Sequence, residues 1–499
     1  MKHSLRRAAI AVSCACAMLT PCAHAIVGQP GTLDSSWNGG GKVITPIGNG
    51  DDSAQAMTLQ PDGKVLVAGY CLNGSQYDFC TARYLASGML DNTWNVTGNV
   101  ITPVGGSDDF ARAVTMQPDG KVLVAGYCLN GTQYDFCTVR YLLNGTLDLT
   151  WNVTGKVITP FGSSNDSAIA MTLQPDGKVL LAGNCFNGTN NDFCAVRYLV
   201  NGMLDPAWNG IGKVITNIGS SDDFARAVTL QPDGKVLVAG NCRNGGNNAF
   251  CVARYQANGM IDATWNSNGA VITPIGSSDD TATAMALQPD GKVLAAGYCL
   301  SGGSYNFCAA RYLASGTLDT TWNGTGKVIT PSGIGGDAAT AMTLQPDGKV
   351  LLTGYCTNGS SVDFCATRYM TNGSLDLTWN STGKVITPIG VGGDYAAAMT
   401  LQPDGKVLLA GYCDGGTNVD FCVARYDGGP FGYRNCSLDI DGDGSVLATT
   451  DSLIHTRIAL GITGSAVVNG ITFPPTATRN TWPLIRDYLV TQCGMSLVQ

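Results

Sequence analysis

The sequence predicts an all-β fold, a seven-bladed β-propeller, and two observations carry this prediction. First, the block QPDGKVL begins seven times at a constant step of 57 residues, at Gln60, Gln117, Gln174, Gln231, Gln288, Gln345 and Gln402. Second, short apolar runs alternate in every unit with turns rich in Gly, Asn and Asp. A unit of this size cannot bury a core alone and must lie against its neighbours, which favours a closed ring. A β-solenoid is the alternative, but its coils are usually shorter and parallel.

Each unit is expected to contain four strands. In the first unit the strand-length runs are Lys42 to Ile47, Ser53 to Gln60, Lys64 to Cys71 and Asp78 to Leu85. Turn residues such as Pro61-Asp62-Gly63 separate them, and no apolar period of 3.6 residues is sustained. Four short antiparallel strands repeated radially describe a propeller blade.

The phase of the repeat predicts how the ring closes. A KVITP run precedes the first QPDGK hairpin, and the last strand-length run ends at Tyr426. If KVITP is the outermost strand, Lys42 to Ile47 has no blade of its own and closes the ring by completing the last one, which removes two exposed edges. The innermost strand is then Ser53 to Gln60, because Ala54 and Ala56 have Ala counterparts in every copy and blades converging on an axis need small side chains. The propeller domain is expected to span residues 26–427.

The repeat resembles a known family. The strings LDxxWNxxGKVITPxG, AxAMTLQPDGKVLVAGY and DFCxARYxxxGxLD are similar to the delta-60 repeat, a bacterial propeller-type repeat related in appearance to NHL blades. The resemblance covers roughly four-fifths of the chain. It implies the fold more than a function, because the family has no single activity. The chain departs from the usual pattern by placing Cys at two positions of every blade.

Residues 1–25 are interpreted as a signal peptide, with Arg6 and Arg7, an apolar stretch and Ala23-His24-Ala25 before the cleavage point. A lipoprotein signal ending at Cys22 is a weaker alternative. Cleavage leaves an even number of cysteines, and in an exported chain each blade's pair, on adjacent strands opposite each other, is expected to form a disulfide. The expected pairs are Cys71 with Cys80, Cys128 with Cys137, Cys185 with Cys194, Cys242 with Cys251, Cys299 with Cys308, Cys356 with Cys365, and Cys413 with Cys422. Cys436 and Cys493 are expected to form a further disulfide that closes the C-terminal domain around its two helices.

Composition argues against familiar catalysis. Every acidic residue is Asp, and His455 is the one histidine after residue 25, so a Ser-His-Asp or Cys-His arrangement in the propeller is excluded. Paired carboxylates of a glycosidase stay possible, although most of the repeated Asp residues are explained by turns. The Trp that recurs once per blade, from Trp37 to Trp379, is either a sugar-stacking platform or an inter-blade packing residue, and its regular place favours packing.

Two features are candidates for ligand binding. Loops before the innermost strands carry Asp residues, among them Asp52, Asp109, Asp223 and Asp280, and would ring the mouth of the channel with negative charge. Local capping of turns is the simpler explanation. The second feature is one inner-strand position that differs from blade to blade and includes Arg112 and Arg226. A ligand that breaks sevenfold symmetry would be recognised there, whereas drift at a tolerant position is the simpler account.

Residues 428–499 are expected to form a small α-helical calcium-loop domain. Alternate carboxylates followed by Gly are what an oxygen-liganded Ca²⁺ loop requires, and the proposed ligands are Asp439, Asp441, Asp443, Ser445 and Asp451. An EF-hand loop would place its last acid at Thr450, one residue earlier than Asp451. The segment resembles a dockerin-type half-motif, and helices are expected over Leu453 to Leu460 and from Asn480 onward. An Asp/Gly-rich turn without an ion is the alternative.

The first functional hypothesis is an exported, disulfide-stapled propeller that acts as a monomeric binding or scaffold module, in the periplasm, at the cell surface or outside the cell. Its C-terminal domain would be stabilised by Ca²⁺ and dock to a partner, an unknown protein or glycan. The alternatives are an Asp-dependent carbohydrate-active hydrolase or lyase and a purely structural surface repeat; an enzyme is the less favoured interpretation. No further transmembrane segment is expected, and the net charge of -8 argues against nucleic acid as a partner.

Overall fold

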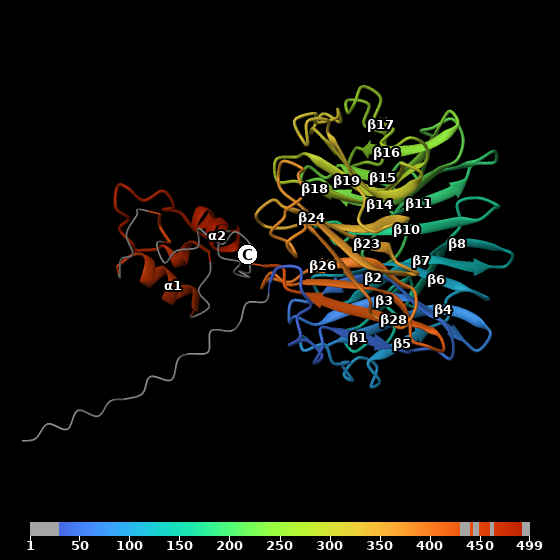
Figure 1. Cartoon of the computed structure of the whole chain (residues 1–499), viewed down its shortest axis with the longest axis horizontal. Helices are drawn as coiled ribbons and strands as arrows, with labels where there is room; N and C mark the ends of the chain where they lie inside the picture. The colour runs from blue at the N-terminus through green and yellow to red at the C-terminus, as the bar shows by residue number, and fades with distance from the viewer. Residues whose placement is uncertain (1–28, 430–439, 443–448, 460–463, 492–499) are drawn as a thin grey trace, which may run out of the picture.

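Seven four-stranded antiparallel sheets are arranged as the blades of a ring in the computed structural model, which describes residues 29–429, 440–442, 449–459 and 464–491 (Figure 1). Each innermost strand contacts the innermost strands of both neighbouring blades, and the cycle is completed by β26 against β2. The all-β seven-bladed propeller predicted from the repeat is confirmed. The predicted signal peptide and the cysteines Cys436 and Cys493 lie outside the described residues.

The four strands of each blade follow the order of the sequence from the axis outward. The innermost strands are β2 (Asp52–Leu59), β6 (Asp109–Met116), β10 (Asp166–Leu173), β14 (Asp223–Leu230), β18 (Asp280–Leu287), β22 (Asp337–Leu344) and β26 (Asp394–Leu401). The second strands are β3 (Val65–Asn73), β7 (Val122–Asn130), β11 (Val179–Phe186), β15 (Val236–Asn244), β19 (Val293–Ser301), β23 (Val350–Asn358) and β27 (Val407–Asp414).

The third strands are β4 (Gln76–Tyr84), β8 (Gln133–Tyr141), β12 (Asn191–Tyr198), β16 (Asn247–Tyr255), β20 (Ser304–Tyr312), β24 (Ser361–Tyr369) and β28 (Val419–Tyr426). The outermost strands are β5 (Asn99–Thr102), β9 (Lys156–Thr159), β13 (Lys213–Thr216), β17 (Ala270–Thr273), β21 (Lys327–Thr330), β25 (Lys384–Thr387) and β1 (Lys42–Thr45).

The QPDGK segment makes the tight turn between the two inner strands. In the first blade the N–H of Gly63 donates to the carbonyl of Gln60 at 2.9 Å, and the N–H of Gln60 donates to the carbonyl of Lys64 at 2.8 Å. Gly63 has a φ of 81°, a left-handed conformation that costs glycine little and other residues more. The turn chemistry therefore explains why this block recurs in every blade.

The N-terminal segment supplies the outer part of the last blade. Strand β1 pairs with β28 from Lys42↔Ala424 to Thr45↔Phe421, and Leu33 bridges Tyr426. The Asp34 carboxylate lies 2.7 Å from Arg425 Nη2 and 2.5 Å from Lys406 Nζ. One blade thus combines the first described residues of the chain with residues near 426.

The hydrophobic core lies between blades. Trp94, which follows β4, packs with Val122 and Tyr141 of the next blade, and its side chain is fully buried. The equivalent tryptophans are all 0–1% exposed. The inter-blade packing hypothesis is therefore confirmed, because a buried ring cannot act as a sugar-stacking platform.

Lysines of the outermost strands add a polar contact between blades. In five blades the Lys ammonium donates to a backbone carbonyl in the preceding blade, as Lys42 does to Pro388 at 3.0 Å and Lys327 to Pro274 at 2.6 Å. Ala270 replaces this Lys in one blade, and a cavity of about 430 Å³ bordered by Ala270 and Asn217 lies there. The cavity therefore borders the position at which a Lys stands in those five blades.

The described residues of the C-terminal segment include two short helices and a 3₁₀ turn. These are α1 (Asp451–Ala459), the 3₁₀ turn at Gly464–Val467 and α2 (Trp482–Thr491). Ile440, Ile454, Val467 and Ile485 are among the residues of its own small core. Both helices lie where the sequence pattern predicts helices. Within the part of the chain described, no helix combines the length and hydrophobicity needed to cross a lipid bilayer.

Candidate functional site

A β-bulge in every innermost strand creates the candidate site. In the first blade the register between β2 and β3 shifts between Ala54 and Ala56, so Gln55 has no partner across the ladder. A bulge re-aims the extra residue, and here that residue is the inner-strand position that varies between blades. The same shift occurs at the equivalent alanines in the other six blades.

A glycine on the second strand permits each bulge. A Cβ added to Gly69 would lie 1.9 Å from the carbonyl oxygen of Ser53, and the equivalent glycines show the same contact at 1.9–2.0 Å. Real Cβ atoms do not approach backbone oxygen so closely, so these positions are closed to any side chain. The glycine of the second strand is thus required by the backbone beside the channel.

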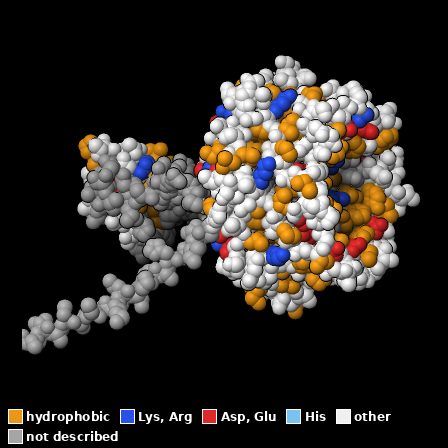
Figure 2. Space-filling view, viewed as in Figure 1, with side chains coloured by type: hydrophobic (Ala, Val, Ile, Leu, Met, Phe, Trp, Pro, Cys, Tyr) orange, Lys and Arg blue, Asp and Glu red, His pale blue; other side chains and the backbone are white. Residues whose placement is uncertain are grey.

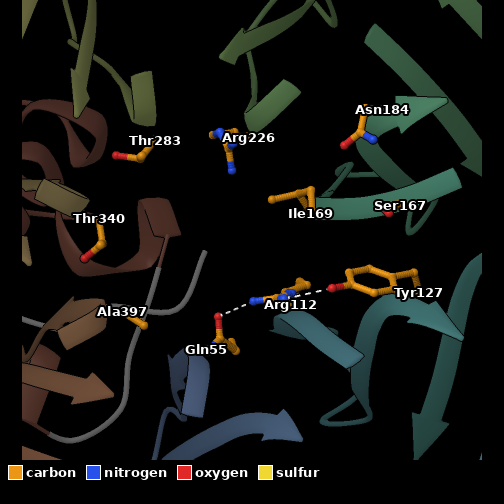
Figure 3. A pocket seen from close by; sticks show the side chains of 10 residues that line it. All are labelled: Gln55, Arg112, Tyr127, Ser167, Ile169, Asn184, Arg226, Thr283, Thr340 and Ala397. Atoms are coloured by element: carbon orange, nitrogen blue, oxygen red, sulfur yellow. Dashed lines mark hydrogen bonds between the residues drawn. The ribbon is translucent and has the colours of Figure 1, made fainter. Parts of the chain in front are cut away.

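The seven bulge residues line one cavity of about 410 Å³ at the centre of the ring (Figure 3). This volume falls in the range of small-molecule sites. The lining is asymmetric because Gln55, Arg112, Ile169 and Arg226 are long, whereas Thr283, Thr340 and Ala397 are short. Tyr127, Ser167 and Asn184 complete it.

Arg112 is held in place by two hydrogen bonds. Its Nη1 donates to Gln55 Oε1 at 2.6 Å and its Nη2 donates to the Tyr127 hydroxyl at 2.8 Å. The guanidinium carbon also lies 5.4 Å from the centre of the Tyr127 ring, within range of a cation–π interaction. Its Nε is buried and has no hydrogen-bond partner among the described residues. Arg226 reaches the same cavity, and its Nε donates to Asn241 Oδ1 at 3.2 Å.

Arg112 and Arg226 differ from the other arginines of the propeller in lacking an ion pair. Each of those others lies within 4.0 Å of an Asp carboxylate, as Arg83 does with Asp91 at 2.8 Å. Within the described residues no salt bridge involves Arg112 or Arg226, so two positive charges face the channel of an acidic protein uncompensated by a carboxylate contact.

The ion pair between Arg83 and Asp91 shows the structural role of the arginines that have a carboxylate partner. Arg83 also donates to the Leu143 carbonyl of the next blade at 2.8 Å, and its guanidinium lies 4.8 Å from the Trp94 ring centre. Burial alone would raise the pKa of Asp91, but hydrogen bonds from Thr93 and the charge of Arg83 outweigh it and lower the pKa to about 2. This pair therefore joins blades.

The predicted anionic ring of Asp52, Asp109, Asp223 and Asp280 is wrong in its placement. All four side chains are 0% exposed. Each carboxylate accepts hydrogen bonds from backbone N–H groups of the preceding loop, as Asp109 does from Val104 at 2.6 Å and Gly105 at 3.0 Å. Burial raises the pKa of Asp109 to about 6, with these N–H groups opposing the rise. These four residues cap turns and cannot touch a ligand.

The Asp residues one position earlier also hold the loops. The N–H of Tyr77 donates to Asp108 Oδ1 at 2.9 Å, and the N–H of Val419 donates to Asp51 Oδ1 at 3.0 Å, in each case from the hairpin of the preceding blade. Asp222 and Asp279 make the same contact at 2.8 Å. On the face drawn in Figure 2, acidic side chains lie in small scattered groups among uncharged ones. Capping therefore explains these carboxylates better than an acidic binding surface does.

Seven disulfides staple the blades. Every predicted blade pair is bonded, with Cα atoms 5.6–5.9 Å apart, within the usual range for a disulfide. The bonded pairs are Cys71 with Cys80, Cys128 with Cys137, Cys185 with Cys194, Cys242 with Cys251, Cys299 with Cys308, Cys356 with Cys365, and Cys413 with Cys422. The disulfide prediction is therefore confirmed in every blade.

The expectation that the two cysteines of a pair lie directly opposite each other is wrong. In the first blade Cys71 faces Asp78, while Cys80 faces Gly69. In every other blade the third-strand cysteine likewise faces the bulge-side glycine rather than its bonded partner, and these cysteines are Cys137, Cys194, Cys251, Cys308, Cys365 and Cys422. The bridge is a diagonal between the second and third strands, two positions apart on one face. Because the residue across from the third-strand cysteine is a glycine, the bonded partner lies two positions along the second strand.

The proposed calcium ligands are only partly described. Asp439, Asp443 and Ser445 lie outside the described residues. Asp441 and Asp451 are buried, and Asp451 Oδ1 accepts the N–H groups of Ile440 at 2.5 Å and Asp441 at 2.9 Å. The described residues contain no group of three or more His, Cys, Asp or Glu side chains that could hold a metal ion.

Comparison with known proteins agrees with the architecture. Seven segments match the model of the "Domain of unknown function (DUF5122) beta-propeller", at residues 60–93, 117–150, 174–207, 231–264, 288–321, 345–378 and 402–428. The chain is a repeat β-propeller. Its matched segments run from the QPDGK turn through the third strand of each blade. No curated protein matches the chain.

Solved structures show likeness in fold alone. A streptogramin B lyase is 10% identical with a TM-score of 0.46, covering 77% of this chain and 96% of that one. Virginiamycin B lyase from Staphylococcus aureus is 12% identical with a TM-score of 0.43, covering 77% and 98%. Sqt1 from Chaetomium thermophilum is 13% identical with a TM-score of 0.41, covering 78% and 100%. These weak likenesses carry no argument about activity.

Sequence reasoning found the varying position but missed what makes it accessible. The bulge, the Tyr127 and Asn184 side chains beside it and the lack of ion pairs at Arg112 and Arg226 were not foreseen. The Ala-X-Ala string, followed on the next strand by a glycine that recurs in every blade, was the available signal, because a glycine in a strand interior often marks a bulge.

Proposed function

We propose that this chain is an exported binding protein in which the disulfide-stapled propeller is the scaffold and the central channel is the ligand site. One observation carries the proposal: the seven bulge residues line one cavity and differ among themselves, while the surrounding framework repeats. A site that recognises an asymmetric ligand needs this combination of a rigid frame and unlike side chains. The seven disulfides support an oxidising compartment.

A glycan and protein binding screen of the exported chain, with and without Ca²⁺, tests this proposal. Ala397→Ile is the matched variant, because Ile169 shows that the bulge position accepts this side chain, and the added atoms would narrow the cavity. We expect a hit in the screen to be weakened by Ala397→Ile. A ligand that binds the variant and the unmodified chain equally would place the site outside the channel and contradict the proposal.

The C-terminal segment is proposed to be a Ca²⁺-stabilised attachment domain. Asp439, Asp441, Asp443 and Asp451 would donate carboxylate oxygens and Ser445 its backbone carbonyl. The contact of Asp451 with the N–H of Asp441 supports the proposal, because it places the start of α1 beside another of the candidate ligands. Bound Ca²⁺ would offset the mutual repulsion of these carboxylates.

Calorimetry of the full chain tests the calcium proposal. At a Ca²⁺ concentration a hundredfold above Kd, the C-terminal transition should gain about 2.7 kcal/mol over its value with chelator. Asp441→Ala should remove most of this gain and leave the propeller transition unchanged. An unmodified chain whose unfolding is the same with millimolar Ca²⁺ and with chelator would reduce the motif to a turn.

The hydrolase or lyase alternative loses part of its support. Four of the carboxylates expected at the channel mouth, Asp52, Asp109, Asp223 and Asp280, are buried in backbone hydrogen bonds. Their neighbours Asp51, Asp108, Asp222 and Asp279 accept hydrogen bonds that hold hairpins of the preceding blades. We therefore propose binding rather than catalysis.

A further inference from the structure

We infer that the channel binds a small ligand through a carboxylate held between Arg112 and Arg226. This inference rests on the proposed function and names the chemistry of its ligand. The two side chains come from β6 and β14, with Ile169 of β10 between them, and all three line the same cavity (Figure 3).

Charge gives the first argument. A half-buried guanidinium is costly unless an anion accompanies it, and the arginines that join blades each have an Asp for this purpose. Arg112 and Arg226 have no such carboxylate among the described residues, although the chain carries more acidic than basic residues. An anion supplied by a ligand would complete both sites.

Donor geometry gives the second argument. Gln55 and Tyr127 use one N–H of each terminal nitrogen of Arg112 and so fix its plane, which leaves other N–H groups of the guanidinium available. The structure describes no partner for the terminal nitrogens of Arg226, whose Nε is anchored by Asn241. Planar guanidinium forks that are already oriented suit a planar carboxylate, which they can bind through two parallel hydrogen bonds.

The shape of the cavity shows where the rest of the ligand lies. Thr283, Thr340 and Ala397 are short, so space remains on the side of the channel across from the long residues. The hydroxyls of Thr283 and Thr340 already donate to the carbonyls of Ala339 and Ala396 at 2.8 Å, and their lone pairs remain able to accept. This side therefore suits a ligand body that carries hydroxyl groups.

The charge around the site favours a monovalent anion over a phosphate dianion. The loops at one end of the innermost strands carry Asp51, Asp108, Asp222 and Asp279, and the chain has a net charge of -8. Repulsion by this field grows with the charge of the entering ligand. A carboxylate on an acidic sugar and one on a free organic acid share the required chemistry, and experiment can separate them.

Isothermal titration of the full chain at fixed ionic strength tests the inference. The probes are D-glucuronate, D-lactate, inorganic phosphate and uncharged D-glucose, of which the first two carry a single negative charge. We expect glucuronate or lactate to bind more tightly than phosphate and glucose. Binding of glucuronate alone would identify an acidic sugar, and binding of lactate alone a free acid. Tighter binding of phosphate, or no heat from either carboxylate at millimolar concentration, would overturn the inference.

Three variants assign the binding to the two arginines. Arg112→Gln and Arg226→Gln should each weaken carboxylate binding at least about tenfold, the effect of losing a charged hydrogen bond. Arg243→Gln is the matched control, since it removes the same charge from a partly exposed position at the end of β15. Circular dichroism and thermal melting check that each variant folds. Equal affinities in the folded channel variants and the control would refute the assignment.

The inference and the proposed function can fail separately. If a ligand found by the screen is weakened by Ala397→Ile but not by either channel arginine variant, the channel is a binding site and the carboxylate inference is wrong. If Ala397→Ile has no effect on that ligand, the proposed function itself is wrong.

Discussion

Replacing Gly126 with Ala should damage the blade that carries Arg112. A Cβ at Gly126 would lie 2.0 Å from the carbonyl oxygen of Phe110 and 2.8 Å from Cα of Ala111. Both are backbone atoms, so no side-chain rotation relieves the contact. Separation to the 3.0 Å below which real Cβ contacts are essentially never seen requires a shift of about 1 Å between β6 and β7.

The destabilisation expected for Gly126→Ala can be estimated from the hydrogen bonds between β6 and β7 that the shift would break. A hydrogen bond stretched by about 1 Å from its usual length of about 2.9 Å is lost. Two or three such bonds at about 1 kcal/mol each give a destabilisation of about 2–3 kcal/mol. Arg112 should also leave its place opposite Gln55, so ligand binding in the channel should weaken with stability.

Gly106→Ala is the control in the same blade. Its added Cβ would have its nearest neighbour at 3.8 Å, and its backbone is not left-handed, so its stability should stay within about 0.5 kcal/mol of the unmodified chain. Guanidinium chloride unfolding followed by tryptophan fluorescence measures both variants. Equal unfolding free energies for Gly126→Ala and Gly106→Ala would refute the requirement for a glycine at the bulge.

Three further predictions concern the ring and its seams. Deletion of residues 26–48 should expose the edge of β28 and cause aggregation detectable by light scattering; a deleted chain that stays dispersed and melts like the full one would show that this segment is dispensable. The free energy of unfolding should fall as the pH drops from about 4 to about 2, because the pKa of Asp91 is lowered from 3.8 to about 2 in the folded state. The stability that ionised Asp91 contributes is present above the unfolded-state pKa of 3.8 and is lost as the pH falls to the folded-state pKa. Denaturant midpoints measured at pH 4 and 2.5 should fall less for Asp91→Asn than for the unmodified chain, and an equal fall in both would argue against a stabilising role of the Arg83 and Asp91 pair. Ala270→Lys should stabilise the chain by about 0.5–1.5 kcal/mol by restoring the hydrogen bond to the carbonyl at Asn217, with Ala270→Met as the uncharged control of similar length; an equal gain from Met would assign the effect to cavity filling.

The repeat made the architecture predictable. A unit that packs against a nearly identical neighbour on each side must form the same contacts in every blade. The strand order, the packing of Trp94 between blades and the pairing of Cys71 with Cys80 follow from this requirement. Each of these features depends on residues that recur at the same position of every 57-residue unit, so the pattern that predicts it occurs seven times in the sequence.

The roles of the aspartates could not be predicted in the same way. Asp51 and Asp52 are adjacent in the sequence, yet one accepts a bond from a neighbouring blade and the other is buried against its own loop. An Asp that caps a turn and an Asp that faces solvent are the same residue type and have the same sequence neighbours. Only the positions of the backbone N–H groups distinguish them, and a repeat pattern does not give those positions.

The bulge explains why the site can vary while the fold does not. Gln55 and its equivalents have no partner across the ladder, so the hydrogen-bonded pairing with the second strand does not constrain their side chains as it constrains those of their neighbours. Side chains as different as that of Ala397 and that of Arg112 occupy this position with the same register shift. The alanines on either side and the glycine opposite hold the backbone, and the residue between them is left to the channel. The fold therefore limits this position by little more than the space in the channel, and its chemistry can be changed one blade at a time, which is the condition that makes single substitutions at Arg112, Arg226 and Ala397 a fair test of binding.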